Sequence, residues 1–279
     1  MVDYLIPKTL IDTLEFINNN ESKIISGATD LLVQRKQGAE ITPNFTKKPV
    51  FIFNIKELKY IRESYEFIYI GACTPVSDLL NHVGIPKLLK KSIEVMASPA
   101  LRNLATLPGN IVNASPAGDT LPILYALNAS VKIQTLNSKR IVKVRDVITG
   151  PRRTILKSNE MITEVLIPKV SFTKEDFIKV GGRKADAISK ISFTYGVNIK
   201  ENIITDLRLV FGAVGPVMVR RKELEEKYTN IEVSKLKELK QEILNDYQEF
   251  ITPINDQRSS KEYRKKVALN LLSDLVDSL

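Results

Sequence analysis

Apolar residues recur along the chain at helical or strand spacing, and clusters of Gly, Pro, Asn and Ser separate these segments. A capping-box-like start at Thr9 precedes four apolar residues, which predicts an amphipathic helix through Ile17. Those four are Leu10, Ile11, Leu14 and Ile17. A short apolar strand follows over 23–26, and the β-branched and aromatic run over 49–55 predicts a buried strand. The first fifty or so residues therefore read as small α/β units.

Residues 56–170 alternate short predicted strands with predicted helices. The strands are expected over 60–62, 67–70, 130–135, 140–144 and 161–167. One helix is expected after Thr74-Pro75, which resembles an N-cap followed by proline in the first turn, and another over 86–97. The segment 98–119 holds too much Pro, Gly, Asn and Ser for regular structure. An irregular segment of about twenty residues inside a compact domain is usually functional.

From about Phe172 the pattern predicts a hairpin and then helices. Segment 188–200 alternates, and 203–211 follows after a tight Glu201-Asn202 turn. Val233–Gln248 is amphipathic, and Ser259–Glu262 resembles a capping box that begins a last helix. The apolar stripe of that helix is Tyr263, Val267, Leu271, Leu275 and Leu279. The whole pattern predicts an α+β protein without internal repeats.

The 279 residues include one cysteine, one histidine and no tryptophan. Cys73 alone cannot form an internal disulfide, a zinc cage or an iron–sulfur cluster, because each needs several ligands. A Ser-His-Asp hydrolase would depend entirely on His82, which we interpret as a solvated helix-end histidine. Redox chemistry in this chain would therefore require a bound organic cofactor.

The hydropathy pattern also bears on location. Met1–Thr9 lacks a basic region followed by an apolar core, so we expect no signal peptide. No stretch approaches the roughly 20 apolar residues of a membrane span. Together with the single free thiol, these features predict a cytoplasmic protein.

Two glycine-bearing turns share one design, in which small residues let a ligand approach the backbone. The first, 24–32, places Gly-Ala-Thr-Asp between a strand and a helix, where successive outward N–H groups bind an anion. The second, 106–113, contains Gly109 and Asn110, and Asp119 after it is an expected N-cap. Neither turn fits the Rossmann or P-loop pattern, and the pair suits a diphosphate clamped between two subdomains. The sequence therefore favours a dinucleotide held in a non-Rossmann way.

Five sequence blocks carry a resemblance to a known family. They are Ser26–Leu31, Arg102–Asp119, Glu160–Pro168, Lys179–Asp186 and Arg258–Leu271. In that order they resemble the FAD-binding medium subunit of the molybdenum hydroxylases, which include xanthine dehydrogenase, carbon monoxide dehydrogenase and aldehyde oxidoreductase. The resemblance implies a two-subdomain FAD-binding fold of the vanillyl-alcohol-oxidase/PCMH type plus a C-terminal α+β domain. The implied segments are 1–55 and 56–170 for the FAD-binding subdomains and 171–279 for the C-terminal flavoprotein domain.

The resemblance also implies which residues hold FAD. Backbone and hydroxyl donors for the pyrophosphate would come from Ile24, Ile25, Ser26, Gly27, Ala28, Thr29, Asp30, Leu31, Thr106, Gly109 and Asn110. Further residues implied near FAD are Met96, Asp119, Ile162, Lys179, Arg183 and Asp186. Asp119 would lie near the nucleotide, Ile162 would contact the flavin through its backbone, and Met96 would pack on the ring or in a helix core. Lys179 would reach toward the isoalloxazine ring, where a cation stabilises the negative charge of reduced flavin.

Two positions depart from the family pattern. Ala28 stands where a second glycine is usual, which is a mild change if the backbone there keeps a negative φ. Pro108 replaces the first glycine of a Gly-Gly pair and has no N–H to donate. We therefore expect FAD to be held through one donor fewer at this loop.

The implied division of labour is specific. FAD would bind this chain, molybdopterin a large partner subunit, and two 2Fe–2S clusters a small iron–sulfur subunit, in a dimer of heterotrimers. Because Cys73 alone cannot ligate clusters, they must lie on another chain, and the benzoyl-CoA reductase branch with its inserted cysteines is disfavoured. The absence of tryptophan and the many Lys, Ile and Glu residues resemble thermophilic archaeal relatives, so an aldehyde of the glyceraldehyde type is the first substrate expected.

Two other functions stay open at this point. A stand-alone flavin reductase of related fold, such as the enolpyruvyl-sugar reductase of cell-wall synthesis, would need a proton donor and substrate residues in the last domain, and no matching set is found. The other alternative is a non-catalytic assembly protein that has lost tight FAD binding. Pro108 is the only residue that suggests this loss.

The net charge of +9 is concentrated in one run. Lys139–Lys157 holds seven basic residues against the single acid Asp146. The run is either a solvated face, a docking surface for an acidic cluster-bearing subunit, or an access route for an anionic acceptor. Nucleic acid is disfavoured, because no binding motif and little aromatic interleaving are present.

Overall fold

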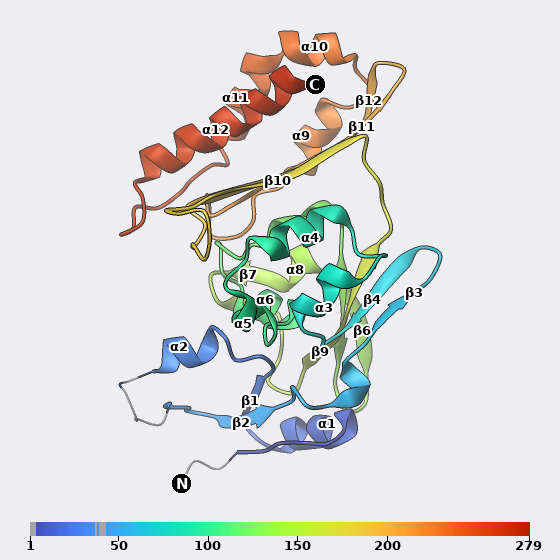
Figure 1. The fold of residues 1–279 in the computed structure, drawn as a ribbon, viewed down its shortest axis with the longest axis vertical. Coiled ribbons are helices and arrows are strands. Elements are labelled where there is room, and N and C mark those ends of the chain that lie inside the picture. Colours follow the sequence, from blue (N-terminus) through green and yellow to red (C-terminus); the bar gives the residue numbers. More distant parts are fainter. Residues whose placement is uncertain (1–3, 37, 39–42) are drawn as a thin grey trace. The chain divides into compact units, whose positions relative to one another are not determined.

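A computed structural model describes residues 4–36, 38 and 43–279. They form two compact units, and each unit is assembled from several segments of the chain (Figure 1). The first consists of the chain up to Pro86 with Ala97–Ala114 and Asn128–Lys169, and the second of Lys87–Met96, Ser115–Leu127 and Val170–Leu279. Both units combine helices with sheets, which confirms the predicted α+β class. Among the described residues, no helix is long and apolar enough to cross a bilayer.

The first unit begins with a small parallel α/β arrangement. Its elements are α1 (Leu10–Asn19), β1 (Ser22–Ile25), α2 (Leu31–Arg35), β2 (Lys48–Phe51) and the 3-10 helix η1 (Lys56–Leu58). The predicted capping box between Thr9 and Asp12 is present, but Ile11 is exposed. β1 pairs in parallel with β2. β2 is shorter than predicted because the chain turns at 52–55, where the N–H of Ile55 donates to the carbonyl of Ile52.

A five-stranded antiparallel sheet forms the centre of the first unit. Its strands run in the order β3 (Ile61–Glu63), β4 (Phe67–Gly71), β9 (Met161–Pro168), β5 (Ser130–Gln134) and β6 (Lys139–Lys143). All five agree with the predicted strands to within one residue at each end. The other elements of this part are α3 (Val76–Asn81), α8 (Val144–Val147), β7 (Ile148–Gly150) and β8 (Arg153–Thr154). β9 is the middle strand of this sheet, and it is buried from Met161 to Ile167.

The sequence predicted that segment 98–119 is irregular, and this prediction is wrong. It contains α5 (Pro99–Arg102) and α6 (Leu107–Asn113). The hydroxyls of Ser98 and Thr106 cap these helices by accepting from the N–H three residues later. Each helix has a proline in its first turn, where an N–H would have no intrahelical partner. Residues interpreted as breakers are therefore helix starts.

Three predicted helix caps are wrong. The Thr74 hydroxyl exchanges hydrogen bonds of 3.0 and 2.9 Å with the backbone of Tyr60 instead of capping α3. The residue before α7 is Thr120, which makes no side-chain cap hydrogen bond, and Asp119 does not cap this helix because its carboxylate has other partners. The last helix is capped by Ser260, one residue later than predicted.

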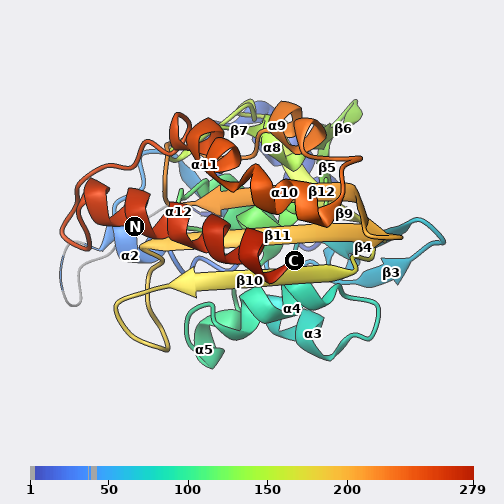
Figure 2. The same cartoon turned by 90° about the horizontal axis from the view of Figure 1, so that it is seen from above.

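The second unit is built on a three-stranded antiparallel sheet of β10 (Lys174–Val180), β11 (Ile191–Lys200) and β12 (Ile203–Gly212). Glu201 and Asn202 have φ of 51° and 63°, the left-handed values of a tight hairpin turn, so the predicted hairpin is confirmed. The helices that contact this sheet or one another are α4 (Lys87–Glu94), α7 (Leu121–Ala126), α9 (Lys222–Lys227), α10 (Val233–Glu238), α11 (Lys240–Gln248) and α12 (Lys261–Ser278). Figure 1 shows α4 on the opposite side of β10 from α10–α12, and Figure 2 shows α12 crossing the strands.

The buried face of α12 differs from the predicted stripe. It consists of Arg264, Ala268, Leu272, Leu275 and Val276. Tyr263 is exposed, because α12 is rotated so that Arg264 turns inward. The Arg264 guanidinium donates to the Ala213 carbonyl at 3.1 Å and to Asp256 at 2.7 Å. A charged residue whose two terminal nitrogens are both hydrogen-bonded thus occupies a position that a hydrophobic pattern cannot assign to the core.

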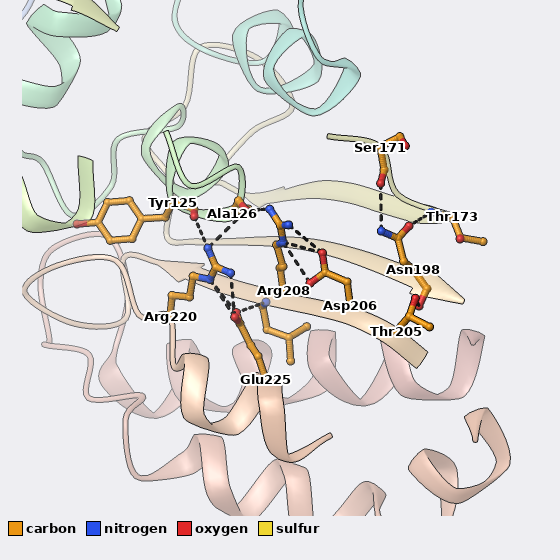
Figure 3. Close-up of polar contacts among 11 residues, drawn as sticks. Tyr125, Ala126, Ser171, Thr173, Asn198, Thr205, Asp206, Arg208, Arg220 and Glu225 are labelled. Atoms are coloured by element: carbon orange, nitrogen blue, oxygen red, sulfur yellow. Dashed lines mark hydrogen bonds and ion pairs between the residues drawn. The ribbon is translucent and has the colours of Figure 1, made fainter. Parts of the chain in front are cut away.

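Arginine side chains hold the carboxyl end of α7 within the second unit (Figure 3). Arg220 donates to the Tyr125 carbonyl at 2.5 Å, and Arg208 donates to the Ala126 carbonyl at 2.8 Å. Glu225 accepts from Arg220 at 2.9 Å, and both side chains are only 5% exposed. These bonds satisfy carbonyls that a helix leaves without partners at its end.

Candidate functional site

A cavity of about 840 Å³ lies within the first unit. Its lining comes from the β1–α2 segment, the residues before β2, the start and end of α6, and the stretch from β8 into β9. The predicted site residues among the lining are Ile24, Ile25, Ser26, Gly27, Ala28, Thr29, Asp30, Leu31, Thr106, Gly109, Asn110 and Ile162. The structure therefore brings both glycine-bearing turns and Ile162 to one cavity.

The loop between β1 and α2 presents backbone donors. Among the described residues, none accepts a hydrogen bond from the N–H of Gly27, Ala28, Thr29 or Asp30. Ala28 has a φ of 58°, so the backbone is left-handed there and the condition of a negative φ is not met. Left-handed backbone within a turn gathers successive N–H groups into an anion-binding concavity. The loop is thus suited to a phosphate group, with alanine in a conformation that favours glycine.

The two turns touch each other at Gly27. A Cβ at Gly27 would lie 1.8 Å from the carbonyl oxygen of Leu104, so no other residue fits this backbone. The Thr106 hydroxyl donates to the Ser26 hydroxyl at 3.4 Å. The separate turns read from the sequence are therefore two walls of one site.

The amino end of α6 supplies fewer free donors than the resemblance implies. The N–H of Gly109 donates to the Thr106 hydroxyl at 3.1 Å, and the N–H of Asn110 donates to the Thr106 carbonyl at 3.0 Å. Pro108, between the cap and Gly109, has no N–H. Gly109 and Asn110 line the cavity, but their backbone donors are used inside the helix.

Positive charge dominates the cavity wall. Its cationic side chains are Lys23, Arg35, Lys47, Arg152 and Lys157, against the carboxylates of Asp30 and Glu160. Burial opposes ionisation of Glu160, but the N–H of Lys157 and the Arg140 guanidinium outweigh it and lower the Glu160 pKa. Partial burial, and then the charges of Arg35 and Lys47, lower the pKa of Lys23. Such a wall favours an anionic ligand.

The other predicted site residues belong to the second unit, and none of them lines the cavity. Lys179 donates to Asp119 at 2.7 Å and to the Val95 carbonyl at 2.8 Å, and both side chains of the ion pair are 8% exposed. Ser189 also donates to Asp119, at 2.7 Å. Burial raises the Asp119 pKa, and the Lys179 ammonium and these hydrogen bonds oppose that rise. The ammonium of Lys179 is thus held in one place by a carboxylate and a carbonyl.

The remaining three predicted residues are a buried methionine and two exposed charged residues. Met96 is buried, with its N–H donating to the Ile93 carbonyl, so it belongs to the core end of α4. Arg183 and Asp186 lie in the β10–β11 loop with exposed side chains. The Arg183 guanidinium donates to the Ala185 carbonyl at 3.0 Å, and Asp186 has a φ of 48°.

The two residues on which metal or hydrolytic chemistry would depend have structural roles. Cys73 is buried and donates to the Ile52 carbonyl at 3.1 Å, and burial raises its pKa to about 12. His82 follows the last residue of α3, as interpreted, and its Nδ1 accepts from the Gly84 N–H at 3.3 Å. Over 4–36, 38 and 43–279, no group of His, Cys, Asp and Glu could hold a metal ion.

Sequence reasoning missed the cations at the amino end of β1. Lys23, Arg35 and Lys47 come from three elements and share no spacing that a motif would show. Arg152 and Lys157 belong to the basic run 139–157, which was interpreted as a solvated face, a docking surface or an access route. The only indication in the sequence was a run of basic residues with few acidic neighbours. The fold shows that Arg152 and Lys157 line a cavity.

Comparison with known proteins gives consistent relatives. Residues 1–170 match the family of the FAD binding domain in molybdopterin dehydrogenase, and 176–279 match the CO dehydrogenase flavoprotein C-terminal domain. The chain is 28% identical to the glyceraldehyde dehydrogenase medium chain of Sulfolobus acidocaldarius, over 95% of this chain and 93% of the relative. It is 30% identical to the nicotinate dehydrogenase FAD-subunit of Eubacterium barkeri, over 80% and 78%.

Solved structures agree on the fold. A chain of carbon monoxide dehydrogenase from Hydrogenophaga pseudoflava superposes with a TM-score of 0.88 at 22% identity, over 98% of this chain and 94% of that chain. The expected FAD-binding fold followed by a C-terminal flavoprotein domain is confirmed. The chain belongs to the family of FAD-binding medium subunits of the molybdenum hydroxylases.

Proposed function

We propose that the cavity of the first unit holds FAD. Its volume of about 840 Å³ lies within the range of cofactor sites, roughly 300–1,000 Å³. The donor set also fits, because the cavity offers free loop N–H groups, threonine hydroxyls and cations for a diphosphate. The observation that carries the proposal is the set of backbone N–H groups at Gly27–Asp30 that no described residue accepts, with a left-handed backbone at Ala28, on a cationic cavity.

The residues of the chain would bind and orient the cofactor. The Gly27–Asp30 N–H groups and the Thr29 hydroxyl would hold the diphosphate, and the start of β9 at Ile162 would contact the flavin through its backbone. Because Pro108 has no N–H and Gly109 is paired inside α6, we propose one donor fewer at this loop than in relatives with two glycines. Bound FAD would supply the chemistry of taking electrons from iron–sulfur clusters on a partner and passing them to the final acceptor.

We keep Asp119, Lys179, Arg183, Asp186 and Met96 as proposed FAD-side residues on the strength of the resemblance. The buried Asp119–Lys179 pair supports a fixed ammonium rather than a solvated strand lysine. The boundaries after residues 55 and 170 and a cytoplasmic location are likewise proposals. The family matches, which end at 170 and begin at 176, support the second boundary.

The chain would work within a heteromeric enzyme. The names of its relatives support this, since they are medium chains or FAD-subunits of dehydrogenases. We propose a large molybdopterin-binding subunit and a small iron–sulfur subunit as partners, in a dimer of heterotrimers, and an aldehyde of the glyceraldehyde type as substrate. The similarity to a glyceraldehyde dehydrogenase medium chain supports the substrate class.

Purification with and without partners tests these proposals. The isolated chain should bind one FAD per chain and show a flavin spectrum, and absence of any FAD binding would refute the central proposal. The native complex should contain molybdenum and iron and oxidise aldehydes in preference to purines or carbon monoxide. Purine or carbon monoxide oxidation would refute the substrate proposal alone.

A further inference from the structure

Three cations gather at one end of the cavity, beside the amino ends of β1 and β2. Lys23 lies on β1, Arg35 in the last turn of α2, and Lys47 directly before β2. The two strands are parallel, with Ser22 opposite Lys48, so their first residues are neighbours. Arg35 and Lys47 are near enough to Lys23 for their charges to lower its pKa.

These cations lack the carboxylate partners that other cations of the first unit have. In the described part of the chain, Lys23 and Arg35 form no ion pair, and Lys47 reaches only the exposed Glu21, at 3.8 Å. By contrast, Arg62 and Lys132 share the buried carboxylate of Glu164. All three residues are exposed, so water screens their mutual repulsion, and their positive charge makes this part of the cavity wall attractive to an anion.

The cation group is separate from the loop that offers backbone donors. Lys23 stands four positions before Gly27, which is at most about 13 Å along an extended chain. The loop already carries its own free N–H groups. The cations therefore add positive charge at a second point of the same cavity.

We propose that Lys23, Arg35 and Lys47 form an anion subsite of the cavity that binds a phosphate group. The proposal rests on the assignment of the cavity to FAD. Lysine and arginine are the side chains that pair with phosphate oxygens through charge-assisted hydrogen bonds. The phosphate has two sources, which are the diphosphate of FAD itself and a separate phosphate bound beside FAD.

Binding measurements on the flavin-free full chain test the subsite. The variants are Lys23→Gln and Arg35→Gln, and the matched control is Lys56→Gln, an exposed lysine outside the cavity lining. FAD and riboflavin are titrated with flavin fluorescence at several salt concentrations. Inorganic phosphate is titrated calorimetrically into flavin-free and FAD-loaded protein. Melting temperatures confirm that each variant is folded.

The outcomes separate the two sources. If the phosphate belongs to FAD, each variant weakens FAD binding about 3- to 10-fold, reduces its salt dependence and leaves riboflavin binding unchanged. If it is a separate phosphate, FAD binding is unchanged and the FAD-loaded variants lose phosphate binding.

The subsite is refuted when the variants match Lys56→Gln in both FAD and phosphate binding. Wild-type protein that binds no FAD would refute the cavity assignment instead. In that case phosphate titration of the flavin-free chain decides the subsite by itself, because a built subsite loses phosphate binding in the variants.

Discussion

The cavity wall of the first unit and the interior of the second unit differ in how their positive charges are paired. In the first unit, Lys23 and Arg35 line a cavity and, as far as the described chain shows, form no ion pair. In the second, Arg220 and Lys179 are almost fully buried and each holds a carboxylate within 3 Å. Cations that lie near other cations and form no ion pair indicate a site for an anionic ligand. A buried cation that is paired with a carboxylate indicates a structural contact.

The carboxylates show the same contrast. In the first unit, burial raises the Glu164 pKa, but Lys132, Tyr60 and Arg62 outweigh it and the net pKa is lowered. In the second unit, burial dominates over Arg220 and raises the Glu225 pKa. Both carboxylates are almost inaccessible, but Glu164 forms salt bridges with two cations and Glu225 with Arg220, so the two carboxylates contribute to stability with opposite dependence on pH.

The largest effect is expected from splitting the Arg220–Glu225 pair. Arg220→Met or Glu225→Leu alone should destabilise the protein by about 3–5 kcal/mol, because each leaves an uncompensated buried charge. The double variant should cost clearly less than the sum of the two. Urea unfolding measures all three. Fully additive losses would contradict a coupled pair.

A substitution at Gly27 tests whether the close approach of the Leu104 carbonyl excludes a side chain from this part of the cavity wall. Gly27→Ala should destabilise by about 3 kcal/mol, because its Cβ would collide with the Leu104 carbonyl. FAD binding should be lost with it. Ala28→Gly is the matched control, since glycine is favoured at a φ of 58°, and its stability should change by less than about 1 kcal/mol. Equal losses in both variants would contradict the contact at Gly27.

The pH dependence of Glu164 sharpens the comparison of carboxylates. Its folded pKa is lowered, so its contribution is present above the unfolded pKa and is lost as pH falls through the folded pKa. Glu164→Gln should cost about 2 kcal/mol at pH 7, and the gap to wild type should close below pH about 4. Thermal unfolding at several pH values measures this. A gap that does not depend on pH would show that the charge of Glu164 is not what stabilises the sheet.

The smallest effect is expected from the cavity cations. In the flavin-free chain, Lys23→Gln should change stability by no more than about 0.5 kcal/mol, because no ion pair is lost and repulsion is relieved. The same substitution at Lys179 should destabilise, since it breaks the buried pair with Asp119. Thermal melts of the two variants side by side make the comparison. A strong loss for Lys23→Gln would mean that this lysine has a structural partner.

Much of the fold is predictable because it depends on periodic burial. The five strands of the central sheet follow short runs rich in β-branched and aromatic residues, and the β11–β12 hairpin follows alternation and a two-residue turn. The short helices α5 and α6 were missed because hydroxyl caps, and not apolar spacing, begin them. Four of the five residues of the predicted stripe, all but Tyr263, are buried or packed against the core. The centre of the buried face was missed because Arg264 carries no hydrophobic signal.

The site residues that are contiguous in the sequence were predictable, and those that come together from distant parts of the sequence were not. Gly27 and its neighbours are contiguous, so the strand–turn–helix pattern of the sequence identifies them. Lys23, Arg35 and Lys47 meet only after β1 and β2 pair, and the partner of Asp119 lies 60 residues away. A local sequence pattern does not predict contacts between residues that are far apart in the chain.

The route of the chain has a consequence for its biosynthesis. α4 and α7 are made early, but the sheet they pack on begins only at Lys174. Until that sheet has left the ribosome, α4 and α7 lack the strands on which they pack, although their apolar residues such as Leu88 and Ile123 are buried in the folded chain. A nascent chain that stops near residue 170, where the first family match ends, would display these helices to solvent and be prone to aggregate.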